Sequence, residues 1–121
     1  MNRKRLLLLN GSPRKAKTSY VFARALKELA EKKGHKAEIF HIIEYFDGEK
    51  PFDTLKSIIL QHDILGLVTP LYADTLPYPV IWFLEKLSSD LAGELKGKEF
   101  FAVAQCGFLD TDLLHPLLES C

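Results

Sequence analysis

The stretch LLLLNGSPRKAKTSY, residues 6–20, decides the fold class, because an unbroken apolar run gives way within it to a polar loop. The segment from Arg5 to Asn10 carries four successive leucines, which is typical of a strand covered on both faces of a sheet. From Thr18 to Lys33 the apolar residues recur with helical spacing. Residues 11–17 therefore form the junction between a first strand and a first helix.

The first helix is predicted to be amphipathic. Gly34 stands just past its last residue, where glycine commonly ends a helix. Spacings of three and four positions place five apolar residues on one face, which we expect to pack against the sheet: Phe22, Ala25, Leu26, Leu29 and Ala30.

The rest of the chain continues the alternation of strand and helix. The predicted segments are a strand over Lys36–Ile42, a loop over Ile43–Pro51, a helix over Phe52–Gln61, a strand over Ile64–Thr69, a loop over Pro70–Pro79, a helix over Pro79–Leu91, a strand over Glu99–Gln105 and a helix over Asp110–Ser120. Strands joined by such helices run parallel with right-handed crossovers. The sequence therefore predicts an α/β protein with a doubly wound, three-layer sandwich.

Bulk composition restricts the function classes. The 121 residues predict a single domain over residues 1–121, and 47% hydrophobic with 26% charged residues is ordinary globular composition. The formal net charge of zero argues against nucleic acid or an anionic membrane as partner. No apolar run has the length of a membrane span, and four leucines are too few for a signal peptide. We expect a cytoplasmic location.

Cysteine and histidine give no metal or disulfide signal. Cys106 and Cys121 lack the spacing of a zinc or iron–sulfur site and are too few for a disulfide framework. Four scattered histidines share no ligand spacing and are interpreted as surface or strand-edge residues: His35, His41, His62 and His115. No metal site is expected.

The carboxyl ends of parallel strands lie at one edge of the sheet, where ligands of this architecture bind. The loops NGSPRKAKTS, TPLYADTLPY and QCGFLD follow the first, third and fourth strands. In the strand order 2-1-3-4 these three strand ends are neighbours. The predicted site is therefore built from three loops that are far apart in the sequence.

The first of these loops has the chemistry of a phosphate site. Gly11 allows a tight turn after the strand, and the helix that follows turns its free N–H groups toward the loop. The loop supplies hydroxyls and cations together: Ser12, Arg14, Lys15, Lys17, Thr18 and Ser19. The alternative is a solvated basic loop in which Thr18 or Ser19 only caps the helix.

A single glycine limits which phosphate this loop can hold. The loop matches neither GxxxxGK[ST] nor GxGxxG, so the two common loops for di- and triphosphates are excluded. A single terminal phosphate, bound by side-chain hydroxyls and one helix end, fits better. The sequence therefore favours a mononucleotide cofactor.

The other two loops suit a flat heterocycle. In the third-strand loop, prolines stiffen the backbone around Tyr72, whose ring can stack on a ligand. The alternative is that aromatic residues cover the end of the core, which we prefer for Trp82. After the fourth strand the chain offers backbone donors, an amide and another ring in Gln105, Cys106, Gly107 and Phe108.

Together, LLLLNGSPRKAKTS and ILGLVTPLYADTLPYPVIWFLEKL resemble the NAD(P)H-dependent FMN reductase family of flavodoxin-like proteins, from Lys4 to about Phe108. The resemblance implies a flavodoxin-like sheet and non-covalently bound FMN. It places the FMN phosphate against Ser12, Pro13, Arg14, Lys17, Thr18 and Ser19. It places the flavin ring against Pro70, Leu71, Tyr72, Ala73 and the turn from Gln105 to Phe108.

The resemblance also implies an activity. Hydride would pass from NADPH or NADH to the flavin and then to a small acceptor such as a quinone or free flavin, with no catalytic protein residue required. Two alternatives stay open: an inactive or truncated flavodoxin-like binding domain, and an FMN electron carrier.

The chain departs from the family pattern at three points. The cysteine cluster that iron–sulfur relatives carry after the third strand is absent between Val68 and Leu87, and Ser88 or Ser89 replaces the usual aspartate in the helix that carries Lys86. The family continues through a fifth strand and a last helix, which we expect to be missing in a chain that reaches Cys121. The fourth strand would then be an edge, so we expect a homodimer.

Overall fold

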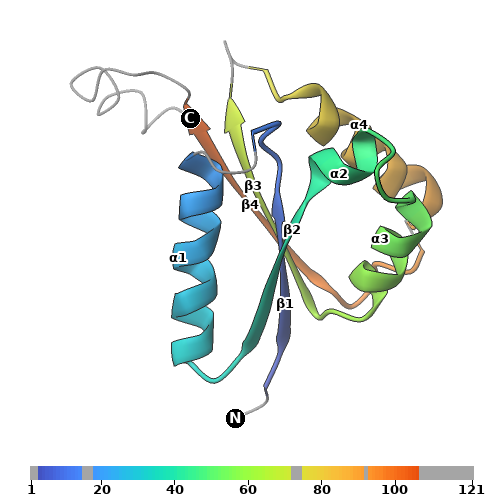
Figure 1. Ribbon diagram of the computed structural model, residues 1–121. Coiled ribbons are helices and arrows are strands. Elements are labelled where there is room, and N and C mark those ends of the chain that lie inside the picture. Colours follow the sequence, from blue (N-terminus) through green and yellow to red (C-terminus); the bar gives the residue numbers. More distant parts are fainter. Residues whose placement is uncertain (1–2, 15–17, 72–74, 92, 107–121) are drawn as a thin grey trace.

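Four parallel strands form one sheet in the order β2-β1-β3-β4 (Figure 1). The computed structural model describes residues 3–14, 18–71, 75–91 and 93–106. Within them the elements are β1 (Arg5–Asn10), α1 (Thr18–Lys32), β2 (Lys36–His41), α2 (Ile42–Phe46), α3 (Phe52–Leu60), β3 (Ile64–Leu71), α4 (Tyr78–Asp90) and β4 (Glu99–Cys106). The predicted α/β class, parallel pairing and order 2-1-3-4 are confirmed, and the predicted helix over residues 110–120 lies outside the described residues.

The described helices form two layers around the sheet. Helix α1 lies on one face, and α2, α3 and α4 lie on the other (Figure 1). Among the described residues, no helix combines the length and the apolar composition needed to cross a bilayer.

Strand β1 is the centre of both layers of the core. Leu7 and Leu9 pack into the larger cluster, which includes residues of α2, α3 and α4. Leu6 and Leu8 pack into the smaller cluster beside α1. Period-two alternation therefore explains the apolar run, because each face of the strand needs apolar side chains. Full burial of one such leucine contributes about 1.5–3 kcal/mol.

The loop predicted over Ile43–Pro51 was wrong in its first part. Strand β2 ends at His41, and the five residues that follow form α2. Ile42 and Tyr45, three positions apart, are both buried in the larger cluster. One apolar helical turn is shorter than the window in which helical periodicity can be recognised. The Gly48 turn signal was right, since this glycine has a φ of 85°.

The prediction that a loop begins at Pro70 was also wrong, because β3 continues to Leu71 and pairs with β4 to its end. The carbonyl oxygen of Val68 accepts a hydrogen bond from Gly11 N, so the backbone N–H and C=O of Val68 face β1. Pro70, two positions further along β3, faces the same side, but the last residue pair between β1 and β3 is Asn10 with Val68. The missing N–H of proline therefore costs the sheet no ladder bond.

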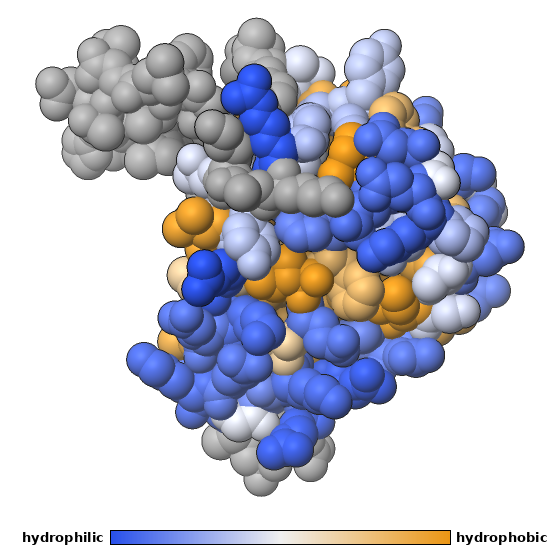
Figure 2. Space-filling view, viewed as in Figure 1, coloured by the Kyte–Doolittle hydropathy of each residue, from blue (hydrophilic) through white to orange (hydrophobic). Residues whose placement is uncertain are grey.

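The apolar face predicted for α1 is only partly correct. Ser19 and Ala23 are the buried residues of this helix, whereas Phe22 and Leu29 are 39% and 52% exposed. These small residues allow the helix to approach the strands closely. The face that contacts the sheet is therefore displaced by about one residue from the predicted apolar face. Apolar surface is visible beside α1 and along the β2 edge in Figure 2, on a face that is otherwise largely hydrophilic.

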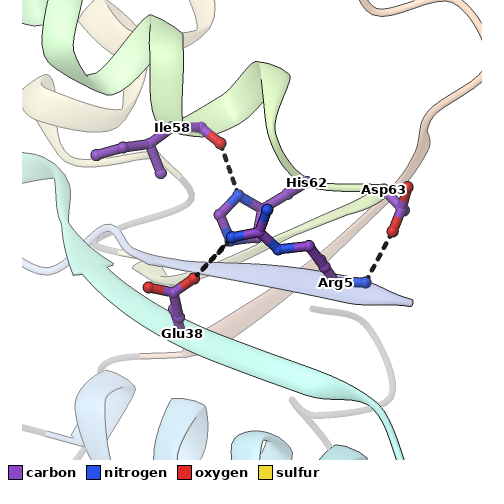
Figure 3. Close-up of polar contacts among 5 residues, drawn as sticks. All are labelled: Arg5, Glu38, Ile58, His62 and Asp63. Carbon is purple, nitrogen blue, oxygen red and sulfur yellow. Dashed lines mark hydrogen bonds and ion pairs between the residues drawn. The ribbon is translucent and has the colours of Figure 1, made fainter. Parts of the chain in front are cut away.

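The amino end of the sheet holds a network of polar contacts (Figure 3). The imidazole of His62 lies 2.6 Å from the carbonyl oxygen of Ile58 through Nδ1 and 3.0 Å from Glu38 Oε1 through Nε2. The backbone N–H of Arg5 donates to the Asp63 carboxylate at 2.8 Å. The interpretation of His62 as a surface or strand-edge residue was wrong, because it is 2% exposed and joins β2 to the end of α3.

Candidate functional site

The first strand end, the start of α1 and the ends of β3 and β4 lie toward the same edge of the sheet, at the top of Figure 1. Parallel pairing puts these ends together, and a hydrogen bond from Gly11 N to Val68 O, 2.7 Å long, extends the contact beyond the last residue of β1. The predicted junction after β1 is thus attached to the neighbouring strand before it turns away.

Gly11 is required at this point by close packing. Its φ lies outside the left-handed region, where Gly34, Gly48 and Gly97 are found among the described glycines. A Cβ at position 11 would lie 2.5 Å from Val80 Cγ2 and 2.9 Å from Thr69 Cβ. The sequence singled out Gly11 for a tight turn, whereas in the structure glycine is needed here because there is no room for a side chain.

Two side chains shape the turn that follows. Ser12 donates its backbone N–H to Asn10 Oδ1 at 3.0 Å, and Arg14 donates its backbone N–H to Ser12 Oγ at 3.1 Å. Asn10 and Ser12 are 0% and 3% exposed, so the hydrogen bond between them forms out of solvent. The described part of the loop therefore has a geometry defined by its own polar groups.

This arrangement changes how an anion could be bound. The backbone N–H groups of Gly11, Ser12 and Arg14 already have acceptors, and Pro13 has no N–H. An anion would instead meet the hydroxyl proton of Ser12, the exposed Arg14 side chain and the first turn of α1, which begins at Thr18. These groups suit one terminal phosphate, because the first turn of a helix favours negative charge.

The predicted site residues are brought together in part. The phosphate side contains Ser12, Pro13, Arg14, Thr18 and Ser19, with the first and last of these buried. On the other side Pro70 pairs with Gln105, and Leu71 pairs with Cys106. Lys17, Tyr72, Ala73, Gly107 and Phe108 lie outside the described residues.

Sequence reasoning missed three polar residues at this edge. Asn10 and Thr69 are buried within the sheet, and His41 lies directly opposite Asn10 in the register of β1 and β2. Asn10 Nδ2 is 3.0 Å from His41 Nδ1, and the Tyr20 ring of α1 lies 5.4 Å from the His41 ring. The available signal was a polar residue ending an apolar strand, which is typical of a functional strand end.

Within the described part of the chain, the resolved pKa shifts fall outside the predicted site. The hydrogen-bonded carboxylates of Glu99, Glu44 and Asp53 raise the pKa of their partner lysines: Lys4, Lys50 and Lys56, respectively. Burial raises the pKa of Tyr45. None of these four is a predicted site residue.

A hollow of 220 Å³ is lined by Val21, Arg24, Ala25 and Glu28. All four residues belong to α1, and none of the predicted phosphate and ring residues that the structure describes is among them. We therefore do not assign this hollow as the cofactor site.

The doubly wound sheet, with a polar loop at the end of its first strand, defines a flavodoxin-like α/β protein. The sequence model of the NADPH-dependent FMN reductase family matches residues 4–110, and the chain belongs to this family. A search of curated proteins returned no match.

Solved structures share the fold. RosB with the bound intermediate 8-demethyl-8-formylriboflavin-5'-phosphate has 19% identity and a TM-score of 0.66, with 97% of this chain and 57% of RosB covered. NAD(P)H:quinone oxidoreductase from Methanothermobacter marburgensis has 19% identity, a TM-score of 0.65, and coverage of 98% and 75%. The flavoenzyme FerB, an NAD(P)H:(acceptor) oxidoreductase from Paracoccus denitrificans, has 20% identity, a TM-score of 0.66, and coverage of 84% and 60%. The chain thus spans little more than half the length of RosB.

Proposed function

We propose that this chain binds FMN non-covalently at the carboxyl edge of its sheet and passes hydride from NADPH or NADH to a small acceptor such as a quinone or a free flavin. The observation that carries the proposal is the turn from Asn10 to Arg14, built on buried side chains at the first strand end of an FMN reductase family member. Bound FMN would supply the redox chemistry.

The proposed roles divide the site into two parts: a phosphate side after β1 and a ring side at the ends of β3 and β4. We assign the phosphate to Ser12, Pro13, Arg14, Lys17, Thr18 and Ser19, and the ring to Pro70, Leu71, Tyr72, Ala73, Gln105, Cys106, Gly107 and Phe108. The phosphate assignment is supported by the backbone N–H groups of Gly11, Ser12 and Arg14, which already have acceptors within the protein. Side chains and the first turn of α1 are then the groups that can bind a single phosphate. RosB, which shares the fold, holds a flavin phosphate.

Residues 1–121 are proposed to act as one FMN-binding domain, in a cytoplasmic homodimer. The pyridine nucleotide that serves as reductant is an intracellular metabolite, which supports the location. Strand β4 pairs with β3 alone among the described strands, and Phe100 on it is 50% exposed. A second subunit would cover such an edge, and light scattering of the purified protein tests this part directly.

Titration with FMN tests the binding site. Replacing Ser12 and Thr18 together by Ala removes two hydroxyls from the phosphate side, and each lost hydrogen bond to a charged group is expected to weaken binding by about tenfold or more. Ser57→Ala, an exposed serine of α3, is the matched control and should leave the affinity unchanged. A wild-type chain that takes up no FMN refutes the proposal.

Turnover distinguishes the reductase from its alternatives. FMN-dependent oxidation of NADPH with a quinone is the expected result. A chain that binds FMN without this turnover is instead a binding domain or an electron carrier, and reduction of its FMN by a protein partner separates those two.

A further inference from the structure

A polar series reaches from β2 into the loop after β1. Asn10, at the end of β1, is completely buried, and its carboxamide contacts both Ser12 and His41. Oδ1 accepts the backbone N–H of Ser12 at 3.0 Å, and Nδ2 lies 3.0 Å from Nδ1 of His41. His41 is the last residue of β2 and is separated from Asn10 by 31 positions in the chain.

The directions of these hydrogen bonds follow from the groups themselves. A backbone N–H can only donate, so the atom of Asn10 that faces Ser12 is the carbonyl oxygen. The amide nitrogen of Asn10 then faces His41, and this nitrogen can also only donate. Nδ1 of His41 is therefore an acceptor without a proton, and a neutral ring carries its proton on Nε2.

We propose that His41 is a positioning residue of the phosphate loop, acting through Asn10 on Ser12. The role in cofactor binding rests on the proposed function, whereas the hydrogen-bonded geometry of the loop does not. The contact from His41 holds the carboxamide of Asn10 in the orientation that accepts the Ser12 N–H. Ser12 in turn accepts the N–H of Arg14, so the position of the His41 ring is transmitted to two residues of the phosphate side.

The ring itself is held from a second element. Tyr20 of α1 packs against His41 with ring centroids 5.4 Å apart, and the Arg24 guanidinium lies 5.9 Å from the centre of the Tyr20 ring. Strands β1 and β2 and helix α1 thus meet at this imidazole. Tyr20 is thus a titratable group of α1 in contact with His41, and the charged Arg24 lies against the same Tyr20 ring.

This geometry gives the loop a pH dependence. A second proton on His41 would occupy Nδ1 and direct an N–H at the amide N–H of Asn10, two donors facing each other. Either the ring or the carboxamide must then turn, and the buried Ser12 N–H loses its acceptor. Acidification should therefore weaken phosphate binding through His41.

Nitrogen NMR of the ring tests the hydrogen-bond assignment without any ligand. With the ring neutral, we expect Nδ1 of His41 to give the signal of an unprotonated nitrogen and Nε2 that of a protonated one. The reverse pattern overturns the proposal, whether or not the chain binds FMN.

FMN titration of three variants tests the positioning role. Gln at position 41 offers an amide oxygen to Asn10 and does not titrate, so His41→Gln should keep the affinity at neutral pH and lose the acid-side weakening. His41→Leu removes the acceptor and should raise the Kd by about tenfold. His35→Gln is the control, since His35 Nδ1 also accepts a backbone N–H, from Lys4 at the other edge of the sheet.

The outcomes separate the two proposals. A wild-type chain without affinity for FMN refutes the proposed function, while the NMR result still decides the role of His41. If FMN binds and His41→Gln keeps the wild-type pH profile, the positioning role is refuted. Should His41→Leu fail to fold, the His41→Gln profile and the ring nitrogens still give the answer.

Discussion

Replacing Gly11 by Ala inserts one methyl group into the contact between the phosphate loop, β3 and α4. The new Cβ would lie 2.5 Å from Val80 Cγ2, and Val80 is completely buried. Carbon atoms pack best at about 3.5 Å or more, so the loop or the helix must move by about 1 Å. A buried valine on a packed helix cannot move away freely, and the loop takes up much of the shift.

Two opposing effects determine how much Gly11→Ala lowers the free energy of unfolding. Overpacking of this kind costs about 1–3 kcal/mol. Alanine also reduces the conformational entropy of the unfolded chain, which returns about 0.4–1 kcal/mol. We therefore expect Gly11→Ala to lower the free energy of unfolding by about 1–2 kcal/mol, equivalent to a fall in Tm of roughly 5–10 °C for a domain of this size.

Thermal unfolding and FMN titration, each with a matched control, check this expectation. Gly93→Ala is the control, because a Cβ at that position meets nothing within 4 Å. Combining Gly11→Ala with Val80→Ala removes the closest contact, so the double variant should be more stable than the sum of the single effects by about 1 kcal/mol. The reasoning is refuted if Gly11→Ala matches Gly93→Ala in Tm and keeps the wild-type affinity for FMN.

Three further changes probe the core and the amino edge of the sheet. Burial raises the pKa of Tyr45, so the folded state holds the phenol proton more tightly than the unfolded state does. The stability that this contributes is intact below about pH 10 and is lost as pH rises through the raised pKa. Tyr45→Phe should therefore flatten the alkaline decline in the free energy of unfolding, measured with urea. Gly66→Ala would drive a Cβ into the Phe101 ring and should cost about 1–3 kcal/mol in the same assay, with Phe101→Leu giving partial rescue and an unchanged midpoint contradicting the packing. His62→Leu removes the contact to Glu38 and should cost about 1–3 kcal/mol, whereas a loss of only a few tenths would show that the Figure 3 network adds little.

The sheet could be predicted because its two central strands, β1 and β3, are apolar on both faces. The run before Asn10 and the segment from Ile64 have compositions that only a covered parallel strand explains, and the connecting helices are long enough to show their period. With every crossover right-handed, few topologies remain.

Other features depended on tertiary contacts that periodicity does not report. The turn α2 is too short for its period to be recognised, and the extension of β3 over Pro70 depends on where its neighbour β1 ends. The rotation of α1 follows from Ser19 and Ala23, whose small size permits close approach. An apolar stripe identifies a face but does not say where the sheet lies against it.

The site was predicted at the level of loops and less well at the level of atoms. Chemistry pointed to Ser12 and Arg14, and both lie in the turn. The groups that hold the turn are Asn10 and His41, which belong to two strands distant in sequence and come together only through their register. The contact between Asn10 and His41 is determined by how β1 and β2 pair, so no local sequence motif predicts it.

The small number of buried residues in α1 has a consequence for how a ligand would be detected. With two buried residues, this helix has little to oppose local opening, and such segments exchange their amide hydrogens ahead of the rest of a domain. An anion on its first turn binds only the closed helix and so adds RT ln(1 + [L]/Kd) to the free energy of opening. Slower exchange along α1, far from the point of contact, would then measure occupancy of the loop.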